Sequence, residues 1–355
     1  MKHFVLLILL SFTVYAKTPS LDEMLSQMIV IGFEGVKEGD KWVDQVARDI
    51  GRQKISGVYL SEKNVQNPEQ LKKLTHYLKT KETRRKFPLL VIVEEEGGKG
   101  SLLDASKGFA AFPSAYDMAK FHDIEEAEKR YLERAQELAN AGINVNFAPV
   151  LELQIENVKT SPRSYSAHEE IVTTYALLFI DALRMKHIVP VVKYFPMAGK
   201  HLENDFSTKV NVTQQFSLKQ LKPYYDLINF GKIQSVLMSH ALNQELDAQN
   251  PAIFSSFIIQ TLLREKMHFE GVVFAHNLRT PSIDTTIEFK KRIIRSIQAG
   301  ADILVFGTYF SENASVHLSV TKIIEDAIKQ GELSIERIER SYERIERLKQ
   351  TLVER

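Results

Sequence analysis

The chain has 355 residues, of which 44% are hydrophobic, and it contains no cysteine. This composition suffices for a substantial core, and the lack of cysteine excludes disulfides, thiolate catalysis and zinc in a cysteine cage. Its 46 lysines and arginines balance 45 aspartates and glutamates, so the charge gives no sign of a nucleic-acid partner.

The first sixteen residues have the pattern of a signal peptide. Lys2 gives a positively charged start, an apolar run follows from Phe4 to Leu10, and Ala16 supplies the small residue of a cleavage site. The apolar run is shorter than the roughly 20 residues of a membrane-spanning helix, which argues against an uncleaved anchor. We therefore expect a signal peptide at 1–16, export to the periplasm and no membrane span after cleavage.

Eight short apolar runs recur along the rest of the chain. They are continuous rather than alternating, as expected for parallel strands that helices cover on the outside. The runs are Met28 to Phe33, Gly57 to Leu60, Leu89 to Val93, Ile143 to Pro149, Val189 to Phe195, Ser235 to Ser239, Gly271 to Phe274 and Asp302 to Phe306.

Helical patterns lie between most of these runs. They are Pro68 to Lys81, Ile124 to Ala141, Glu169 to Lys186, Leu218 to Phe230 and Ser255 to Lys266. A last amphipathic pattern, Ser334 to Arg355, predicts a terminal helix whose apolar face packs on the barrel and whose charges face solvent. Because no low-complexity linker divides the chain, the order predicts one α/β domain over residues 17–355, a (β/α)8 TIM-type barrel.

Polar residues follow four of the runs at the ends where barrel enzymes carry their sites. Glu94, Glu95 and Glu96 follow the third run, Lys193 and Tyr194 close the fifth, His240 follows the sixth, and His276 and Asn277 follow the seventh. The acidic residues abut an apolar strand and precede Gly97 and Gly98, a context that favours a site over a solvated loop. His240 has two open interpretations, a hydrogen-bonded barrel histidine or a ligand contact.

Metal binding requires several well-placed histidines or carboxylates. The histidines at 187, 201, 240, 268 and 276 lie on different elements, without the spacing of a metal-binding helix. We therefore expect no metal site and no cofactor.

Six motifs occur in a fixed order along the mature chain. They are Leu25 to Gly35, Leu89 to Lys99 (similar to LLIaiDqEGGrV), Gly142 to Val150, Lys193 to Gly199, Pro251 to Ser255 and Ala299 to Asp302. Together they resemble glycoside hydrolase family 3, in its single-barrel β-N-acetylhexosaminidase branch. The resemblance implies retaining glycoside hydrolysis, in which an aspartate after the seventh strand attacks the anomeric carbon.

The nucleophile motif departs from the family pattern. The family's sequence motif there resembles G-V-I-F-S-D-D-L, whereas this chain continues after Phe274 with Ala275, His276, Asn277 and Leu278. Both acidic positions are lost, and a neutral imidazole or carboxamide stabilises an oxocarbenium-like transition state far less than a carboxylate does.

The acid/base motif departs as well. In this branch K-H-F-P-G-H-G is followed by D-S-H, whose aspartate and histidine act as the acid/base pair. This chain has one extra residue, then Asp205 and, in place of histidine, Ser207, which cannot serve as a base near neutral pH. His201 in the same loop is the candidate substitute, while Glu203 and Asp205 are interpreted as solvated.

The resemblance also implies sugar-binding residues. Glu94 stands where the family has a sugar-binding aspartate, and Arg163 and Lys193 match its arginine and lysine. Lys99 replaces an arginine and cannot form a planar bidentate pair, and Tyr194 replaces a histidine. With His240, these residues form the predicted substrate-binding set.

Three hypotheses follow. The first is an exported, catalytically impaired barrel that binds a glycan containing N-acetylglucosamine, such as peptidoglycan, or an envelope protein. The second is an active glycosidase that uses replacement groups such as Glu94, Glu95 or Glu96 with His201; the third is an envelope scaffold without sugar binding. A retaining pair of carboxyl groups needs a separation of about 5 to 5.5 Å and an inverting pair about 6.5 to 9.5 Å.

Overall fold

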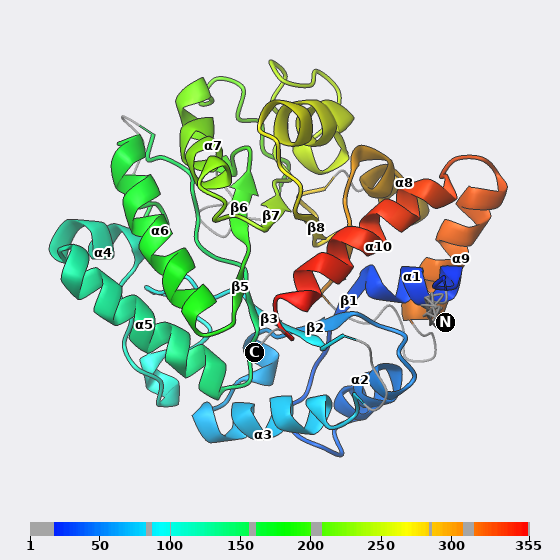
Figure 1. Cartoon of the computed structure of the whole chain (residues 1–355), viewed down its shortest axis with the longest axis horizontal. Helices are drawn as coiled ribbons and strands as arrows, with labels where there is room; N and C mark the ends of the chain where they lie inside the picture. Colours follow the sequence, from blue (N-terminus) through cyan, green and yellow to red (C-terminus); the bar gives the residue numbers. More distant parts are fainter. Residues whose placement is uncertain are drawn as a thin grey trace, which may run out of the picture.

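Nine short strands form one parallel sheet that curves into a barrel, with helices around it (Figure 1). The computed structural model describes residues 18–82, 87–99, 101–155, 161–199, 208–283, 286–307 and 316–353. The predicted signal peptide and the loop residues His201, Glu203, Asp205 and Ser207 lie outside these ranges. The strands are β1 (Ile29–Gly32), β2 (Gly57–Tyr59), β3 (Leu90–Val93), β4 (Val145–Asn146), β5 (Val189–Pro190), β6 (Val192–Phe195), β7 (Ser235–Met238), β8 (Val272–His276) and β9 (Ile303–Phe306).

The order of the strands explains how the barrel closes. The hydrogen-bonded sequence is β5-β4-β3-β2-β1-β9-β8-β7-β6, with every neighbouring pair parallel. The two ends of this sequence, β5 and β6, are separated along the chain by Val191 alone. They are the halves of one predicted run, the first paired with β4 and the second with β7. The predicted eight-stranded barrel is therefore confirmed.

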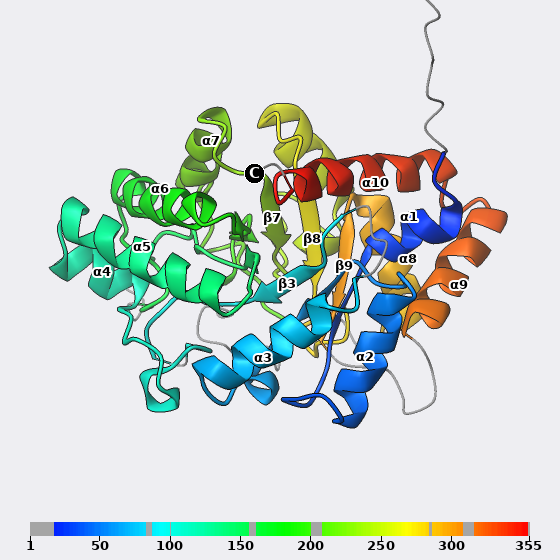
Figure 2. The same ribbon diagram turned by 60° about the horizontal axis from the view of Figure 1, so that its bottom comes forward.

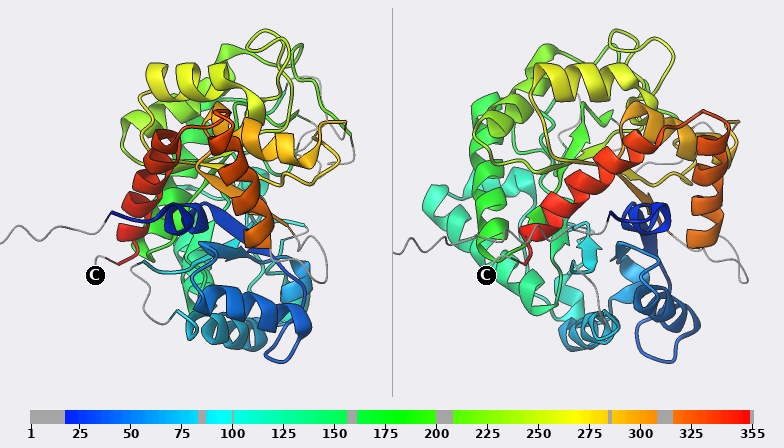
Figure 3. Two further views of the ribbon diagram at one scale, coloured as in Figure 1. Left: turned by 90° about the vertical axis from the view of Figure 1, so that its right-hand side faces the viewer. Right: turned by 45° about the vertical axis from the view of Figure 1, so that its right-hand side comes forward.

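Helices cover the outside of the barrel (Figure 3). The α-helices are α1 (Leu21–Gln27), α2 (Lys41–Gly51), α3 (Pro68–Lys79), α4 (Ala115–Phe121), α5 (Ile124–Asn140), α6 (Glu169–Met185), α7 (Lys222–Asn229), α8 (Phe289–Ala299), α9 (Val316–Lys329) and α10 (Ile335–Gln350). Short 3-10 turns are η1 (Glu62–Asn64), η2 (Ala105–Lys107), η4 (Leu218–Leu221) and η5 (Ala252–Phe254), and η6 (Phe257–Lys266) is π-helical. Among the described segments, none is a helix of the length and apolarity needed to traverse a bilayer.

Local sequence sets the helix boundaries. The Asn67 side chain accepts a hydrogen bond from the Gln70 N–H at 2.9 Å, just before Pro68 begins α3. The predicted helix from Leu218 to Phe230 is instead divided into η4 and α7. Pro223 lies at the start of α7, where its missing N–H does not interrupt a helical hydrogen bond.

Aromatic rings fill the barrel interior near one end. Phe147, after β4, and Phe274, in β8, are fully buried, and their ring centroids lie 5.3 Å apart although their strands lie on different sides of the barrel. The Tyr59 ring, at the end of β2, lies 6.0 Å from that of Phe147.

Helix α10 lies across the opposite end of the barrel (Figures 1 and 2). Its Ile338 and Ile345 are buried, as predicted from the apolar pattern. The expectation that its charges face solvent is wrong for Arg337 and Lys349, which are 9% and 0% exposed. Lys349 Nζ donates to the Ser56 carbonyl at 3.0 Å, just before β2, because strand starts present carbonyl groups that a helix residue can satisfy.

Candidate functional site at the barrel mouth

Polar side chains from four segments meet at the C-terminal ends of the strands. Glu94 and Glu96 follow β3, Lys193 and Tyr194 belong to β6, Arg163 lies in the loop after β4, and Tyr59 ends β2. Because all strands are parallel, these ends lie at one mouth of the barrel. We call these six residues the mouth cluster.

Glu94 is the centre of the mouth cluster. It accepts hydrogen bonds from Tyr194 Oη at 2.6 Å and from Tyr59 Oη at 3.2 Å. Its Oε1 forms an ion pair with Lys193 Nζ and lies 3.4 Å from Arg163 Nη2. Four donors from three segments thus fix one carboxylate.

Glu96 forms the second ion pair of the cluster. Arg163 donates to it in bidentate fashion, from Nε at 2.7 Å and from Nη2 at 2.6 Å, and Lys193 Nζ contacts it as well. Burial opposes ionisation, but the charges of Arg163 and Lys193 outweigh it and lower the pKa of Glu96. Glu96 is therefore ionised at neutral pH, when it has no proton to give.

The two tyrosines keep their hydroxyl protons. Burial and the negative charge of Glu94 raise the pKa of Tyr59 and of Tyr194 well above the ordinary value. Tyr194 also accepts a hydrogen bond from Arg163 Nη2 at 3.1 Å. Both hydroxyls remain donors to Glu94 across the physiological pH range.

The charges of the mouth cluster balance, but its charged side chains differ in their exposure to solvent. Two carboxylates face two cations, so the group is neutral overall. The side chain of Lys193 is 0% exposed and that of Arg163 12%, whereas Glu94 is 25% exposed. The surface offered to a ligand is therefore the edge of Glu94, with the cations beneath it.

Glu95 points away from this cluster. It is fully buried, and its carboxylate accepts hydrogen bonds from Ser101 Oγ at 2.5 Å and from the Leu103 N–H at 3.1 Å. It holds the loop after β3 rather than facing a ligand. Gly97 turns the same loop at φ 88°, where a Cβ would lie 2.2 Å from the Pro113 carbonyl oxygen. Of the three glutamates predicted to form a site, only Glu94 and Glu96 therefore belong to the mouth cluster.

The end of β8 carries the position at which the resemblance implies a nucleophile. His276 is the last residue of β8, and Asn277 follows it. Asn277 Oδ1 accepts from the Arg279 N–H at 3.2 Å and from the Gly307 N–H, after β9, at 3.3 Å. The carboxamide therefore closes a turn and joins two neighbouring strand ends.

Two predicted substrate-binding residues lie apart from the contacts that define the mouth cluster. Lys99 is exposed beyond Gly98. His240 is buried, and its Nδ1 lies 2.8 Å from Ser282 Oγ, in the segment after β8. The structure thus brings together Glu94, Arg163, Lys193 and Tyr194 from the predicted set, and their role in ligand binding stays a prediction.

The sequence interpretation missed Tyr59 and Glu152. Glu152 is 2% exposed, and its carboxyl group accepts from the N–H groups of Ala198 at 2.5 Å and Gly199 at 3.1 Å. Burial raises its pKa to about 8, although these two hydrogen bonds oppose the rise. Both residues stand at strand ends, Tyr59 on the second run and Glu152 after the fourth, so the rule that found Glu94 could have found them.

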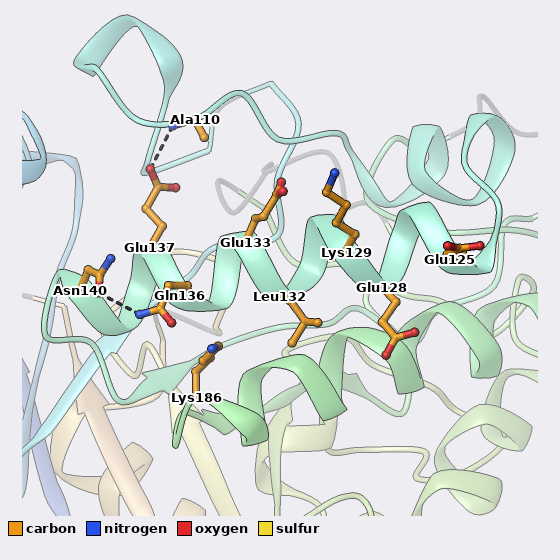
Figure 4. A pocket seen from close by; sticks show the side chains of 10 residues that line it. All are labelled: Ala110, Glu125, Glu128, Lys129, Leu132, Glu133, Gln136, Glu137, Asn140 and Lys186. Atoms are coloured by element: carbon orange, nitrogen blue, oxygen red, sulfur yellow. Dashed lines mark hydrogen bonds between the residues drawn. The ribbon is translucent and has the colours of Figure 1, made fainter.

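Within the described parts of the chain, no group of three or more histidine, aspartate or glutamate side chains is placed to hold a metal ion. A groove of about 690 Å³ lies on the outer side of α5, lined by residues that include Glu128, Leu132 and Lys186 (Figure 4). None of the mouth cluster lines it.

Comparisons with known proteins agree with the barrel fold. A β-hexosaminidase of Haemophilus influenzae is 26% identical over 260 residues, 71% of this chain and 72% of the relative. One of Actinobacillus pleuropneumoniae serotype 3 is 29% identical over 264 residues, 71% and 73% of the two chains. The crystal structure of β-N-acetylhexosaminidase from Beutenbergia cavernae has a TM-score of 0.80 at 22% identity, covering 94% of this chain and 99% of that one.

The family assignment rests on a match along most of the chain. Residues 20–348 match the glycosyl hydrolase family 3 N-terminal domain. The chain therefore belongs to glycosyl hydrolase family 3.

Proposed function

We propose that this protein is an exported family 3 barrel without effective hydrolytic activity that binds a glycan containing N-acetylglucosamine, such as peptidoglycan, at its mouth. One observation carries the proposal. His276, the last residue of β8, stands where the resemblance implies the nucleophilic aspartate, and the carboxamide of Asn277, which follows it, accepts hydrogen bonds from the N–H groups of Arg279 and Gly307. An engaged, neutral amide supplies neither the bond nor the charge of a carboxylate nucleophile.

Sugar binding is supported by what remains at the mouth. Glu94 presents carboxylate oxygens that accept hydrogen bonds from sugar hydroxyls, and the donors beneath it fix its position. Because the Glu94 carboxylate is already held in place, a sugar hydroxyl could bind it without the entropic cost of ordering the side chain. The names of the relatives, β-hexosaminidases, favour N-acetylhexosamine as the sugar class.

A binding titration tests this proposal. Calorimetric titration with N-acetylglucosamine and with a peptidoglycan disaccharide should show saturable binding to the wild type. We expect Glu94→Gln to weaken it at least about tenfold, because the charged acceptor is lost while the shape is kept. Glu128→Gln on the exposed face of α5 is the matched control and should bind like the wild type.

If none of the tested sugars binds, the proposal that the protein binds a glycan is contradicted. The scaffold hypothesis, in which an envelope protein is the partner, would then become the better account. Equal affinity in Glu94→Gln and wild type would place the sugar somewhere other than the mouth cluster.

The second candidate, an active glycosidase with replacement groups, has acidic side chains available at the mouth. Glu94 and Glu96 lie side by side there, but Lys193 Nζ contacts one oxygen of each, so these oxygens lie closer together than the separation of about 5 to 5.5 Å in a retaining pair. Glu152, with a pKa of about 8, keeps its proton at neutral pH as a general acid must.

The contacts of these same groups oppose the second candidate. Glu94 and Glu96 both bind Lys193 and Arg163, so each is held by cations instead of facing an anomeric carbon. Glu152 is 2% exposed and is bonded to the backbone of Ala198 and Gly199. Hydrolysis that depends on both Glu94 and Glu152 would favour this candidate over the first.

A further inference from the structure

A second charged cluster lies at the end of the barrel that α10 covers. Asp302, just before β9, is fully buried. Its carboxylate accepts hydrogen bonds from Arg264 Nη2 at 2.8 Å and from Ser341 Oγ at 2.8 Å. Arg337 Nη1 and Arg344 Nη1 lie 3.5 and 3.4 Å from the same carboxylate. One negative charge thus joins three arginines.

The cations exceed the anions in this region. Burial lowers the pKa of Arg264 to about 10, and the charges of Arg344 and Arg337 add to that effect while Asp302 opposes it. Buried guanidinium groups repel one another, and an anion that they share offsets this repulsion. An added negative charge would therefore be favourable here.

A cavity opens next to this cluster. Its volume is about 300 Å³, and its lining includes Arg344, Arg347, Gln234, His268 and Glu270. The side chain of Arg344 is 14% exposed, and its Nε is buried without a hydrogen-bond partner among the described residues. Such a donor is uncommon in a native structure, and an acceptor that reached it would satisfy it.

The geometry points to a second ligand site at the N-terminal end of the barrel, one that takes a phosphate-type oxyanion. Arg344 supplies the unsatisfied Nε, and the exposed Arg347, three residues further along α10, lines the same cavity. Arginine pairs preferentially with tetrahedral and planar oxyanions through several N–H groups at once. The volume admits inorganic phosphate or the phosphate of a small monoester. This site is independent of the glycan proposed for the mouth.

Titration calorimetry with inorganic phosphate and, in a second arm, glycerol phosphate tests the inference at constant ionic strength. We expect saturable binding of one equivalent by the full chain in at least one arm, and the arm that binds more tightly identifies the source of the phosphate. Arg347→Gln should weaken binding at least about tenfold, because the exposed guanidinium contacts the anion without supporting the fold. Arg340→Gln, on the same helix but outside the cavity lining, is the matched control and should change affinity less than twofold.

A variant with the opposite expected effect distinguishes binding in this cavity from nonspecific binding of phosphate elsewhere on the protein. Glu270→Gln removes the carboxylate at the cavity and should tighten binding severalfold. Three results would overturn the inference: no saturable binding in either arm, binding that is equal in Arg347→Gln and wild type, or binding lost in the mouth variant Glu94→Gln.

Discussion

At the scale of single residues, Glu152 departs clearly from the ordinary chemistry of a carboxyl group. Its pKa rises from 4.5 to about 8 in the folded protein because the side chain is buried. The folded state therefore binds the proton more tightly than the unfolded state does. The stability that follows from this proton is complete below pH 4.5 and is lost as the pH rises through about 8.

A change of Glu152 to glutamine should remove this pH dependence. Between pH 5.5 and 8 we expect the free energy of unfolding of the wild type to fall by about 3 kcal/mol, and that of Glu152→Gln to fall much less. Urea unfolding of both proteins at several pH values measures the difference, with Glu128→Gln as an exposed control. Parallel pH profiles would show that Glu152 ionises normally.

Residue-level prediction from the sequence depended on strand ends and on motif matches. Lys193 and Tyr194 were identifiable because they close an apolar run, and Arg163 because of its motif. Tyr59 was missed because an aromatic residue at the end of an apolar run is typical of the core. Glu152 follows the fourth run and could have been found by the strand-end rule, but its raised pKa could not, because it depends on burial against Ala198 and Gly199, which only the folded chain brings to it.

At the scale of elements, the loop after β3 positions both acidic residues of the mouth. Gly97 has φ 88°, and a Cβ there would lie 2.2 Å from the Pro113 carbonyl oxygen. Gly39 has a similar φ of 90°, with nothing within 4 Å of the corresponding Cβ. A substitution at Gly39 therefore meets only the cost of the backbone conformation, whereas one at Gly97 also meets a steric clash.

Alanine substitutions should expose this difference. We expect Gly39→Ala to cost about 1 kcal/mol, from the backbone conformation alone. Gly97→Ala should cost at least about 2 kcal/mol more and should weaken ligand binding at the mouth, because the loop must move away from Pro113. Chemical unfolding compares the two, and equal losses would mean that this loop accommodates the methyl group.

The strands and most helices could be predicted because their apolar periodicity is local. The split of the predicted helix at Leu218 to Phe230 could not be read from periodicity, since η4 and α7 share one pattern and differ only in hydrogen bonding. The cations of α10 were misassigned for another reason. From the sequence, Arg337 and Lys349 are expected at the surface because they are charged. In the folded chain they are buried because carbonyl and carboxylate groups at the strand starts accept their hydrogen bonds.

At the scale of the whole molecule, Asp302 joins three elements at the closed end of the barrel. It binds Arg264 of η6 and Arg337 and Arg344 of α10. Asp302→Asn should lower the free energy of unfolding by at least about 3 kcal/mol, because it leaves the guanidinium groups without their shared anion. Thermal and urea unfolding measure this, beside the control Asp326→Asn, whose side chain is 39% exposed. A loss below about 1 kcal/mol would show that other groups compensate the arginines.

The two ends of the barrel therefore have different roles in this account. The mouth combines a balanced cluster around Glu94 with a strand end that lacks a carboxylate, whereas the opposite end combines a structural carboxylate with surplus cations. The family barrel was predictable from eight runs and six motifs. The pairing pattern within each end was not, since it joins residues 100 positions apart at the mouth and 293 positions apart at the opposite end.

Hydrolysis of an aryl N-acetyl-β-glucosaminide is the measurement that tests the central claim most directly. The account predicts no turnover by the wild type above the protein-free rate, because loss of a nucleophile costs several orders of magnitude. It also predicts a higher rate in His276→Asp than in the wild type, since that change returns a carboxylate to the end of β8. Wild-type turnover of about 1 s⁻¹ or faster, within the range of ordinary enzymes and abolished by Glu94→Gln, would contradict the account.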